Sequence, residues 1–191
     1  MQDKDAGVVM ALDLERGELS AAMNAYFSKC IEKIGFVPNV LAAYAQDNAK
    51  LEAFAGFYNE LMLAPSGLSK LEREMIAVVV SAENRCFYCL VAHGAAVRQL
   101  SGDPLLGEAI AFNYRMAHLT PRQRAMLDFA ILMCRASAEI EEKDREALRA
   151  AGHSDKDIWD IAAVASFYAM SNRMASATGM MPNTQYHALA R

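Results

Sequence analysis

Apolar residues recur every three to four positions along most of the 191-residue chain, the spacing that is typical of amphipathic α-helices. The stretch 18–34 shows this pattern clearly. Its apolar face would be formed by Leu19, Met23, Phe27, Cys30 and Ile34. Alternating β patterns bounded by turns do not occur, and the chain has only 10 Gly and 5 Pro residues. The pattern therefore predicts an all-α fold.

Start and stop signals divide the chain into separate helices. Capping boxes are readable at Ser69 with Glu72 and at Thr120 with Gln123, and Ser154 opens the last long helix. Glycines follow several apolar stretches, where a left-handed residue commonly ends a helix. We expect helices over residues 18–34, 38–44, 48–64, 69–83, 84–100, 104–113, 120–136, 141–151 and 154–178.

The length fits a single domain over residues 1–191, with an N-terminal extension at 1–17 and a C-terminal tail at 184–191. "LSKLEREMIAVVVSA" and "LTPRQRAMLDFAILMC" share a Leu-Ser/Thr start, an early Arg and an apolar stretch. This weak similarity suggests an internal repeat of helical hairpins.

Composition excludes several classes of function. The net charge is −4 and no dense Lys/Arg cluster is present, so we expect no nucleic-acid partner. No apolar run reaches the ~18 residues that would span a bilayer, so we expect no membrane role. The N-terminus is acidic and lacks the basic start and long apolar run of a secretory signal. We expect a cytoplasmic protein.

The segment "ENRCFYCLVAH", residues 83–93, holds the strongest chemical signal in the chain. On a helix, Cys86, Cys89 and His93 fall within roughly 60° of one another, so both sulfurs and the imidazole face one side. The first cysteine lies in the first turn, where the helix dipole and unpaired N–H groups lower the pKa of a thiol. His93 is the nearest base for the second cysteine.

Three interpretations of this segment are open. The pair can be a redox dithiol, in which one thiolate attacks an oxidant and the other closes a disulfide. It can be two buried cysteines that pack as small hydrophobes. It can also be a zinc site with Cys86, Cys89 and His93 as ligands, although a second CxxC is missing and Cys30 and Cys134 lie in apolar runs. The spacing and a reducing compartment favour the redox dithiol, without a metal or other cofactor.

"EMIAVVVSAENRCFYCLVAHGAAVRQL" resembles the active-site stretch of the carboxymuconolactone decarboxylase and alkylhydroperoxidase D (AhpD-like) superfamily. The superfamily pattern is an acid, then CxxC, then His four residues beyond the second Cys. The likeness to its branch of uncharacterised peroxidase-related proteins extends over most of residues 18–183, through "GFVPNVLAAYAQ", "DPLLGEAIAFNYRMAHLTPRQRAML" and "LRAAGHSDKDIWDIAAVASFYAMSNRMASATG".

The resemblance implies an AhpD-like helical fold, assembly as a homo-oligomer, and a thiol-dependent peroxidase or disulfide reductase activity. Carried over, Cys89 becomes the sulfenic acid, Cys86 is its proton donor and disulfide partner, and Glu74 with His93 forms a proton relay. The alkylhydroperoxidase has a His between its cysteines, where this chain has Tyr88. The expected partners are a hydroperoxide or disulfide substrate, and a reducing protein or small thiol that restores the dithiol.

Other functions stay open from the sequence. The dithiol could act as a redox sensor or adaptor that switches assembly without turnover. A lactone-type decarboxylase is a lesser alternative, because that chemistry does not call for a CxxC pair.

Several polar residues outside the motif have two interpretations. Glu83 could approach Cys86 or lie at a helix end on the surface. Asn172 and Arg173 interrupt the last apolar helix, where they either pair with acids at an interface or lie on a solvated face. His118 and His153 are expected to be exposed loop or cap residues.

Overall fold

The computed structural model describes residues 9–191, and these residues form α-helices and short 3₁₀ helices without a strand. The all-α prediction is confirmed. The part of the N-terminal extension before residue 9 lies outside the described residues. The α-helices are α1 (Ala21–Ile34), α2 (Asn39–Tyr44), α3 (Asn48–Met62), α4 (Lys70–Glu83), α5 (Phe87–Ser101), α6 (Leu106–Asn113), α7 (Pro121–Ala136), α8 (Glu142–Ala150), α9 (Asp155–Thr178) and α10 (Gln185–Ala188). The 3₁₀ helices are η1 (Tyr114–Met116) and η2 (Ser137–Glu139).

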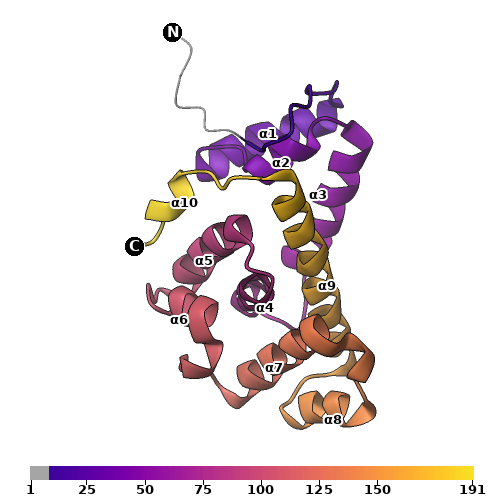
Figure 1. The fold of residues 1–191 in the computed structure, drawn as a ribbon, viewed down its shortest axis with the longest axis vertical. Coiled ribbons are helices and arrows are strands. Elements are labelled where there is room, and N and C mark those ends of the chain that lie inside the picture. Colours follow the sequence, from indigo (N-terminus) through magenta and orange to yellow (C-terminus); the bar gives the residue numbers. More distant parts are fainter. Residues whose placement is uncertain (1–8) are drawn as a thin grey trace.

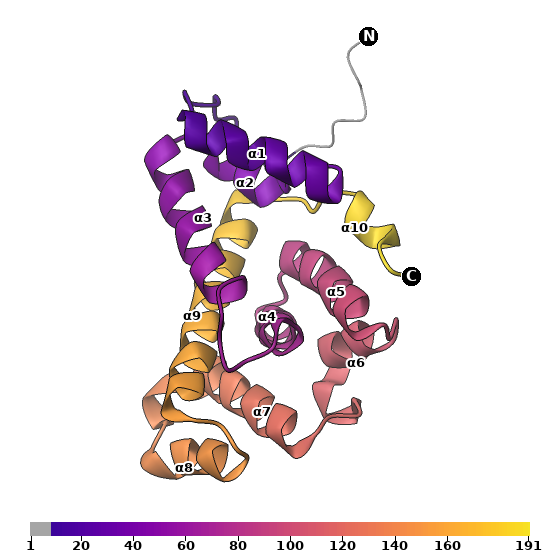
Figure 2. The ribbon, with the colours of Figure 1, turned by 180° about the vertical axis from the view of Figure 1, so that it is seen from behind.

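Helix α4 is the centre of the fold. Figure 1 shows it end-on, with α5, α6, α7 and α9 arranged around it, and Figure 2 shows the same ring from behind. Ten consecutive residues, 72–81, are buried. A helix that is covered on every side must be apolar all round, and "MIAVVV" supplies that surface. Residues on α4 can therefore reach the dithiol from inside the core.

Helices α1, α2 and α3 lie at one end of this ring, with the C-terminal α10 beside α1 and α5 (Figure 1). The tail predicted at 184–191 is therefore partly helical, over Gln185–Ala188. Arg98 on α5 holds this segment through hydrogen bonds to the carbonyl oxygens of Tyr186 and Leu189. Since no long apolar period marks so short a helix, the sequence pattern missed it.

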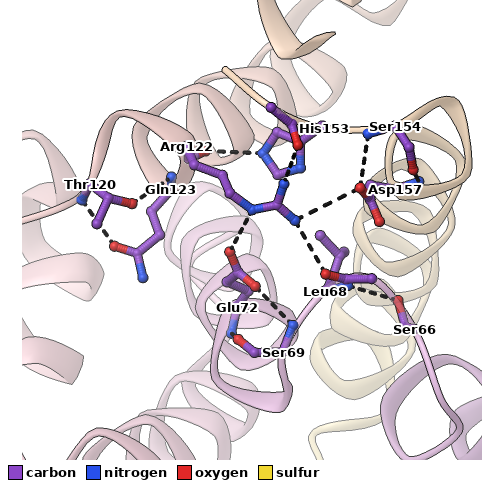
Figure 3. Close-up of polar contacts among 12 residues, drawn as sticks. Ser66, Leu68, Ser69, Glu72, Thr120, Arg122, Gln123, His153, Ser154 and Asp157 are labelled. Carbon is purple, nitrogen blue, oxygen red and sulfur yellow. Dashed lines mark hydrogen bonds and ion pairs between the residues drawn. The ribbon is translucent and has the colours of Figure 1, made fainter. Parts of the chain in front are cut away.

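The capping boxes predicted for α4 and α7 are present, and the predicted start of α9 at Ser154 also forms a capping box, with Asp157. Figure 3 shows that Arg122, near the start of α7, contacts residues at the starts of α4 and α9. Its guanidinium donates to Glu72 at 3.3 Å and lies 3.8 Å from Asp157. It also donates to the carbonyl oxygens of Gly152 and Gly67, at 2.7 and 3.2 Å. One side chain thus fixes the starts of α4 and α9 relative to α7.

His153 belongs to the same junction, so its prediction as an exposed residue is wrong. Its side chain is buried, and its Nε2 lies 3.1 Å from the carbonyl oxygen of Arg122 (Figure 3). The turn signal around Gly152 was correct, but the α7–α8–α9 packing encloses the turn. Among the described residues, no helix is long and apolar enough to cross a membrane.

Candidate active site

The dithiol lies where the central helix ends and α5 begins. Helix α4 ends at Glu83, and Arg85 then takes a left-handed φ of 53°, so the chain cannot continue as a helix. Cys86 is the N-cap of α5, and its N–H donates to the carbonyl oxygen of Ser81 at 2.9 Å. The predicted start of this helix, 84–86, was slightly early. Cys86 therefore lies at the N-terminal, positive end of the α5 dipole.

Both cysteines are free and buried, with exposed fractions of 1% for Cys86 and 2% for Cys89. Hydrogen bonding from the Cys89 thiol, and also from the Cys89 backbone, Asn172 and Ser176, lowers the pKa of Cys86 to about 6 despite its burial. The pKa of Cys89 is raised, first because its thiol donates to Cys86 and then because it is desolvated. The lowered pKa of Cys86 and the raised pKa of Cys89 have one cause, which is that the two sulfurs share a single proton. At neutral pH the pair carries one negative charge and one proton.

Glu74 and His93 form a direct pair beside the dithiol. Glu74, on α4, places Oε2 2.6 Å from Nδ1 of His93, on α5, and both side chains are largely buried. A carboxylate only accepts hydrogen bonds, so Nδ1 of His93 is the donor in its contact with ionised Glu74. Spacing within α5 predicted the position of His93. The contact with Glu74 depends on the packing of α4 against α5.

Two tyrosines complete the surroundings of this pair. Tyr168 on α9 packs edge-on against the His93 ring, with centroids 4.6 Å apart, and its hydroxyl lies 3.4 Å from Nδ1. Tyr88, between the two cysteines, accepts a hydrogen bond from the N–H of Val40 at 2.9 Å. Burial raises the pKa of both tyrosines, so both hydroxyls stay neutral. Neither can serve as a base at physiological pH.

A cavity of about 520 Å³ opens onto Cys89 and His93. Its inner wall is aromatic and aliphatic, and includes Tyr58, Tyr88, Phe54, Phe167, Leu41 and Ala92. Exposed residues of the lining, among them Lys33, Gln99 and Gln185, form a polar rim. Cys89 borders this space whereas Cys86 lies behind it. Such a volume and lining suit a small organic molecule.

Sequence reasoning missed three contributors to the site. Tyr168 and Asn172 are on α9, and Tyr186 on α10 forms part of the cavity wall. Asn172 is 1% exposed, so the prediction that it lies at an interface or on a solvated face is wrong. Its position within a long apolar run was the available signal, because a lone amide there needs a buried partner.

Two other candidates from the sequence were Glu83 as a site residue and a metal site, and the structure supports neither. Glu83 makes a two-pronged ion pair with Arg135 of α7, at 2.8 and 2.7 Å, and this contact lowers the pKa of Glu83. It does not border the cavity. Among residues 9–191, no group of three or more His, Cys, Asp or Glu side chains is arranged to hold a metal ion.

Comparison with known proteins places this site in a family. The sequence profile described as the carboxymuconolactone decarboxylase family matches residues 48–104, which include all four predicted site residues. An uncharacterised peroxidase-related protein from Silicibacter sp. TM1040 is 61% identical, with a TM-score of 0.93, over 100% of this chain and 99% of its own. This chain belongs to the carboxymuconolactone decarboxylase and AhpD-like superfamily. No curated protein matches the sequence.

A second AhpD-like relative supports the same assignment. This uncharacterised peroxidase-related protein from Ralstonia eutropha JMP134 is 43% identical, with a TM-score of 0.92, over 97% of this chain and 98% of its own. The debrominase Bmp8 shares the fold at 19% identity and a TM-score of 0.74, over 89% of this chain and 90% of its own.

Proposed function

We propose that this protein reduces an organic hydroperoxide with the Cys86–Cys89 dithiol, and that an external thiol restores the dithiol afterwards. The observation that carries the proposal is the position of Cys89. It borders an apolar cavity, its thiol contacts Cys86, and the Glu74–His93 pair lies beside the same space. The names of the AhpD-like relatives support a peroxidase, and the dithiol mechanism is our own proposal.

The first step uses the single charge of the pair. The proton shared with Cys86 shifts away from Cys89, whose thiolate is the one that faces the cavity. That sulfur attacks the terminal oxygen of the hydroperoxide, and the O–O bond breaks. Cys89 becomes a sulfenic acid, while the departing alkoxide takes the proton from the Cys86 thiol and leaves as an alcohol.

The second step closes the disulfide. The Cys86 thiolate attacks the sulfur of the Cys89 sulfenic acid, and the S–O bond breaks. The released hydroxide leaves as water with a proton from solvent, which His93 takes up and passes on while Glu74 holds the ring in place. The sum is one hydroperoxide, one thiolate, one thiol and one solvent proton converted to one alcohol, one water and one disulfide. An external dithiol then supplies the two electrons that reduce the disulfide.

The test is a peroxidase assay with cumene hydroperoxide and dithiothreitol, because the cumyl group fits an apolar cavity of this size. Cys89→Ser is expected to lower dithiol-dependent peroxide consumption at least 100-fold, since the attacking sulfur is removed. Cys134→Ser is the matched control, because Cys134 is a half-buried cysteine of α7 that does not border the cavity. Its activity should equal that of the unmodified protein.

Two outcomes would overturn the proposal. Equal consumption by the protein and by Cys89→Ser would remove the dithiol from the reaction. Formation of one Cys86–Cys89 disulfide per chain without repeated turnover would instead favour a redox sensor.

A further inference from the structure

The cavity beside Cys89 extends along one face of α5, from the dithiol toward the C-terminal end of that helix. Its lining includes Cys89, Ala92, Ala96 and Gln99, which are spaced by three or four residues and therefore share one helix face. The rise along the helix axis from Cys89 to Gln99 is ~15 Å. The two alanines between them have small side chains that leave room above the helix, so the cavity is long as well as apolar.

Helix α1 contributes a second row of side chains to the same cavity. Tyr26, Cys30 and Lys33 all line it, and they are again spaced by four and three residues. Lys33 lies in the last turn of α1, just as Gln99 lies in the last turn of α5. Each row therefore ends in a polar residue at the C-terminal end of its helix.

The C-terminal segment brings these two helix ends together, and Figure 2 shows α10 beside α1 and α5. The ring of Phe36, which follows α1, packs edge-on against the ring of Tyr186, with centroids 5.0 Å apart. Arg98 of α5 donates to the carbonyl oxygens of Tyr186 and Leu189. The exposed polar residues that line the cavity at this end form its rim, and they are Lys33, Gln99 and Gln185.

The charges of the lining suit an anion at the rim. Of the described residues that line the cavity, only Lys33 is a Lys or Arg and only Glu74 is an Asp or Glu. Glu74 is paired with His93, at 2.6 Å. Within residues 9–191, no carboxylate forms an ion pair with Lys33. The rim thus offers an unneutralised cation, whereas the dithiol at the inner end is negative and repels an anion.

We propose that this cavity selects long-chain hydroperoxides that end in a carboxylate, with the peroxide group at Cys89 and the carboxylate on Lys33 at the rim. A zigzag of about twelve C–C bonds, each ~1.5 Å long, spans the ~15 Å between the two ends. The substrate class is therefore a fatty-acid hydroperoxide whose peroxide group lies about that far from its carboxyl carbon. The inference rests on the proposed function and names its substrate class.

The experiment compares kcat/KM for two forms of linoleic acid hydroperoxide with the peroxide group on the thirteenth carbon, the free acid and its methyl ester. Dithiothreitol is the reductant, and the detergent is the same in both assays. The acid should be preferred about fivefold, the upper range for an ion pair with an exposed lysine. Lys33→Met should lower this preference below about twofold, and Lys33→Arg should keep it. The isomer with the peroxide group on the ninth carbon should show no such preference, because its carboxylate does not reach the rim.

Lys29→Met is the matched control, because Lys29 is an exposed lysine of the same helix that does not border the cavity. It should keep the preference for the acid. The inference is overturned if the unmodified protein reacts equally with acid and ester, if Lys29→Met loses the preference as Lys33→Met does, or if the ninth-carbon isomer shows the same preference.

A binding measurement separates this inference from the proposed function. The alcohols that correspond to the two substrates, a hydroxy acid and its methyl ester, cannot react with the dithiol. Isothermal titration calorimetry should show that the unmodified protein binds the hydroxy acid about fivefold more tightly than the ester, and that Lys33→Met loses this difference. This result without any peroxide consumption would count against the proposed reaction alone. Equal binding of acid and ester would overturn the role of Lys33.

Discussion

Two buried polar clusters connect α4 to α9, one at each end of their contact. The first is the Arg122 cluster, formed by Arg122, Glu72, Asp157 and His153 at the two helix starts (Figure 3). The second is the dithiol cluster, formed by Cys86, Cys89, Asn172, Ser81 and Asn84 at the end of α4. Both clusters place charge in the interior of the protein, yet they differ in whether a side chain of opposite charge neutralises it.

In the Arg122 cluster, the negative charges of Glu72 and Asp157 are neutralised by Arg122 and by N–H groups at the starts of their own helices. Glu72 and Asp157 each accept the N–H of their own N-cap residue, and the guanidinium lies between them. Burial by itself would raise the pKa of Asp157. Hydrogen bonds from Ser154 and the charge of Arg122 outweigh burial, so the pKa is lowered and the carboxylate stays ionised. The cluster has the form of a structural junction.

In the dithiol cluster, no cation neutralises the thiolate within the group of residues that forms it. The charge is held by hydrogen bonds and by the start of α5, and Cys89 borders a cavity that a small molecule can enter. The carboxylates of the Arg122 cluster, Glu72 and Asp157, do not border this cavity. The two clusters therefore differ in two ways: the dithiol cluster lacks a neutralising cation, and one of its residues, Cys89, borders the cavity.

The largest expected effect is at the Glu74–His93 pair beside the dithiol cluster, which we propose is a proton relay. His93→Gln keeps a hydrogen-bond donor for Glu74 but removes the imidazole. We expect kcat/KM for cumene hydroperoxide to fall about 100-fold, the usual contribution of a general acid or base. Steady-state assays and a thermal melt of the same sample measure both quantities. A fall in melting temperature without a loss of activity in the folded fraction would mean that His93 is structural.

The Arg122 cluster should respond in the opposite way. Arg122→Ala leaves Glu72 and Asp157 without their cation, and should lower the free energy of unfolding at pH 7 by about 2–3 kcal/mol. Urea unfolding followed by circular dichroism measures the change. Activity per folded molecule should be unaltered. A loss of activity in the folded molecules would show that the two clusters are coupled through α4.

The pH dependence of this loss has a definite sign. The pKa of Asp157 is lowered in the folded protein, so its contribution to stability is complete above the unfolded pKa of about 4 and disappears as the pH falls through the folded value. The difference between Arg122→Ala and the unmodified protein should therefore shrink below about pH 4. A difference that stays constant down to pH 3 would contradict the role of the carboxylates.

The smallest expected effect separates packing from chemistry at Tyr88. Tyr88→Phe removes only the hydroxyl that accepts the N–H of Val40, and should cost about 1 kcal/mol of stability, or roughly 2–4 °C in melting temperature. We expect kcat/KM to change less than about twofold, because the buried hydroxyl stays protonated. If Tyr88→Phe loses as much activity as His93→Gln, this hydroxyl belongs to the proton path after all.

The sequence alone predicted the all-α class, nearly every helix and the shared face of Cys86, Cys89 and His93. These features depend on contacts within a few residues, such as capping boxes and helical spacing, which are legible in a single chain. The position of Glu74 came from the resemblance to the AhpD-like superfamily. The superfamily itself was also recognisable from the CxxCxxxH segment.

Only the tertiary structure decided which distant residues complete the site. The packing of α9 against α4 and α5 brings Asn172 to Ser81 and Tyr168 to His93, across 91 and 75 residues of sequence. The packing of α7, α8 and α9 buries His153, and residues of α1, α3, α5, α9 and the C-terminal segment line the cavity. Local patterns record which face of a helix is apolar, but not which helix will cover it. Only the packing of helices that are distant in the sequence could bring the Asn172 amide, the Cys86–Cys89 pair and the apolar cavity into one region of the protein.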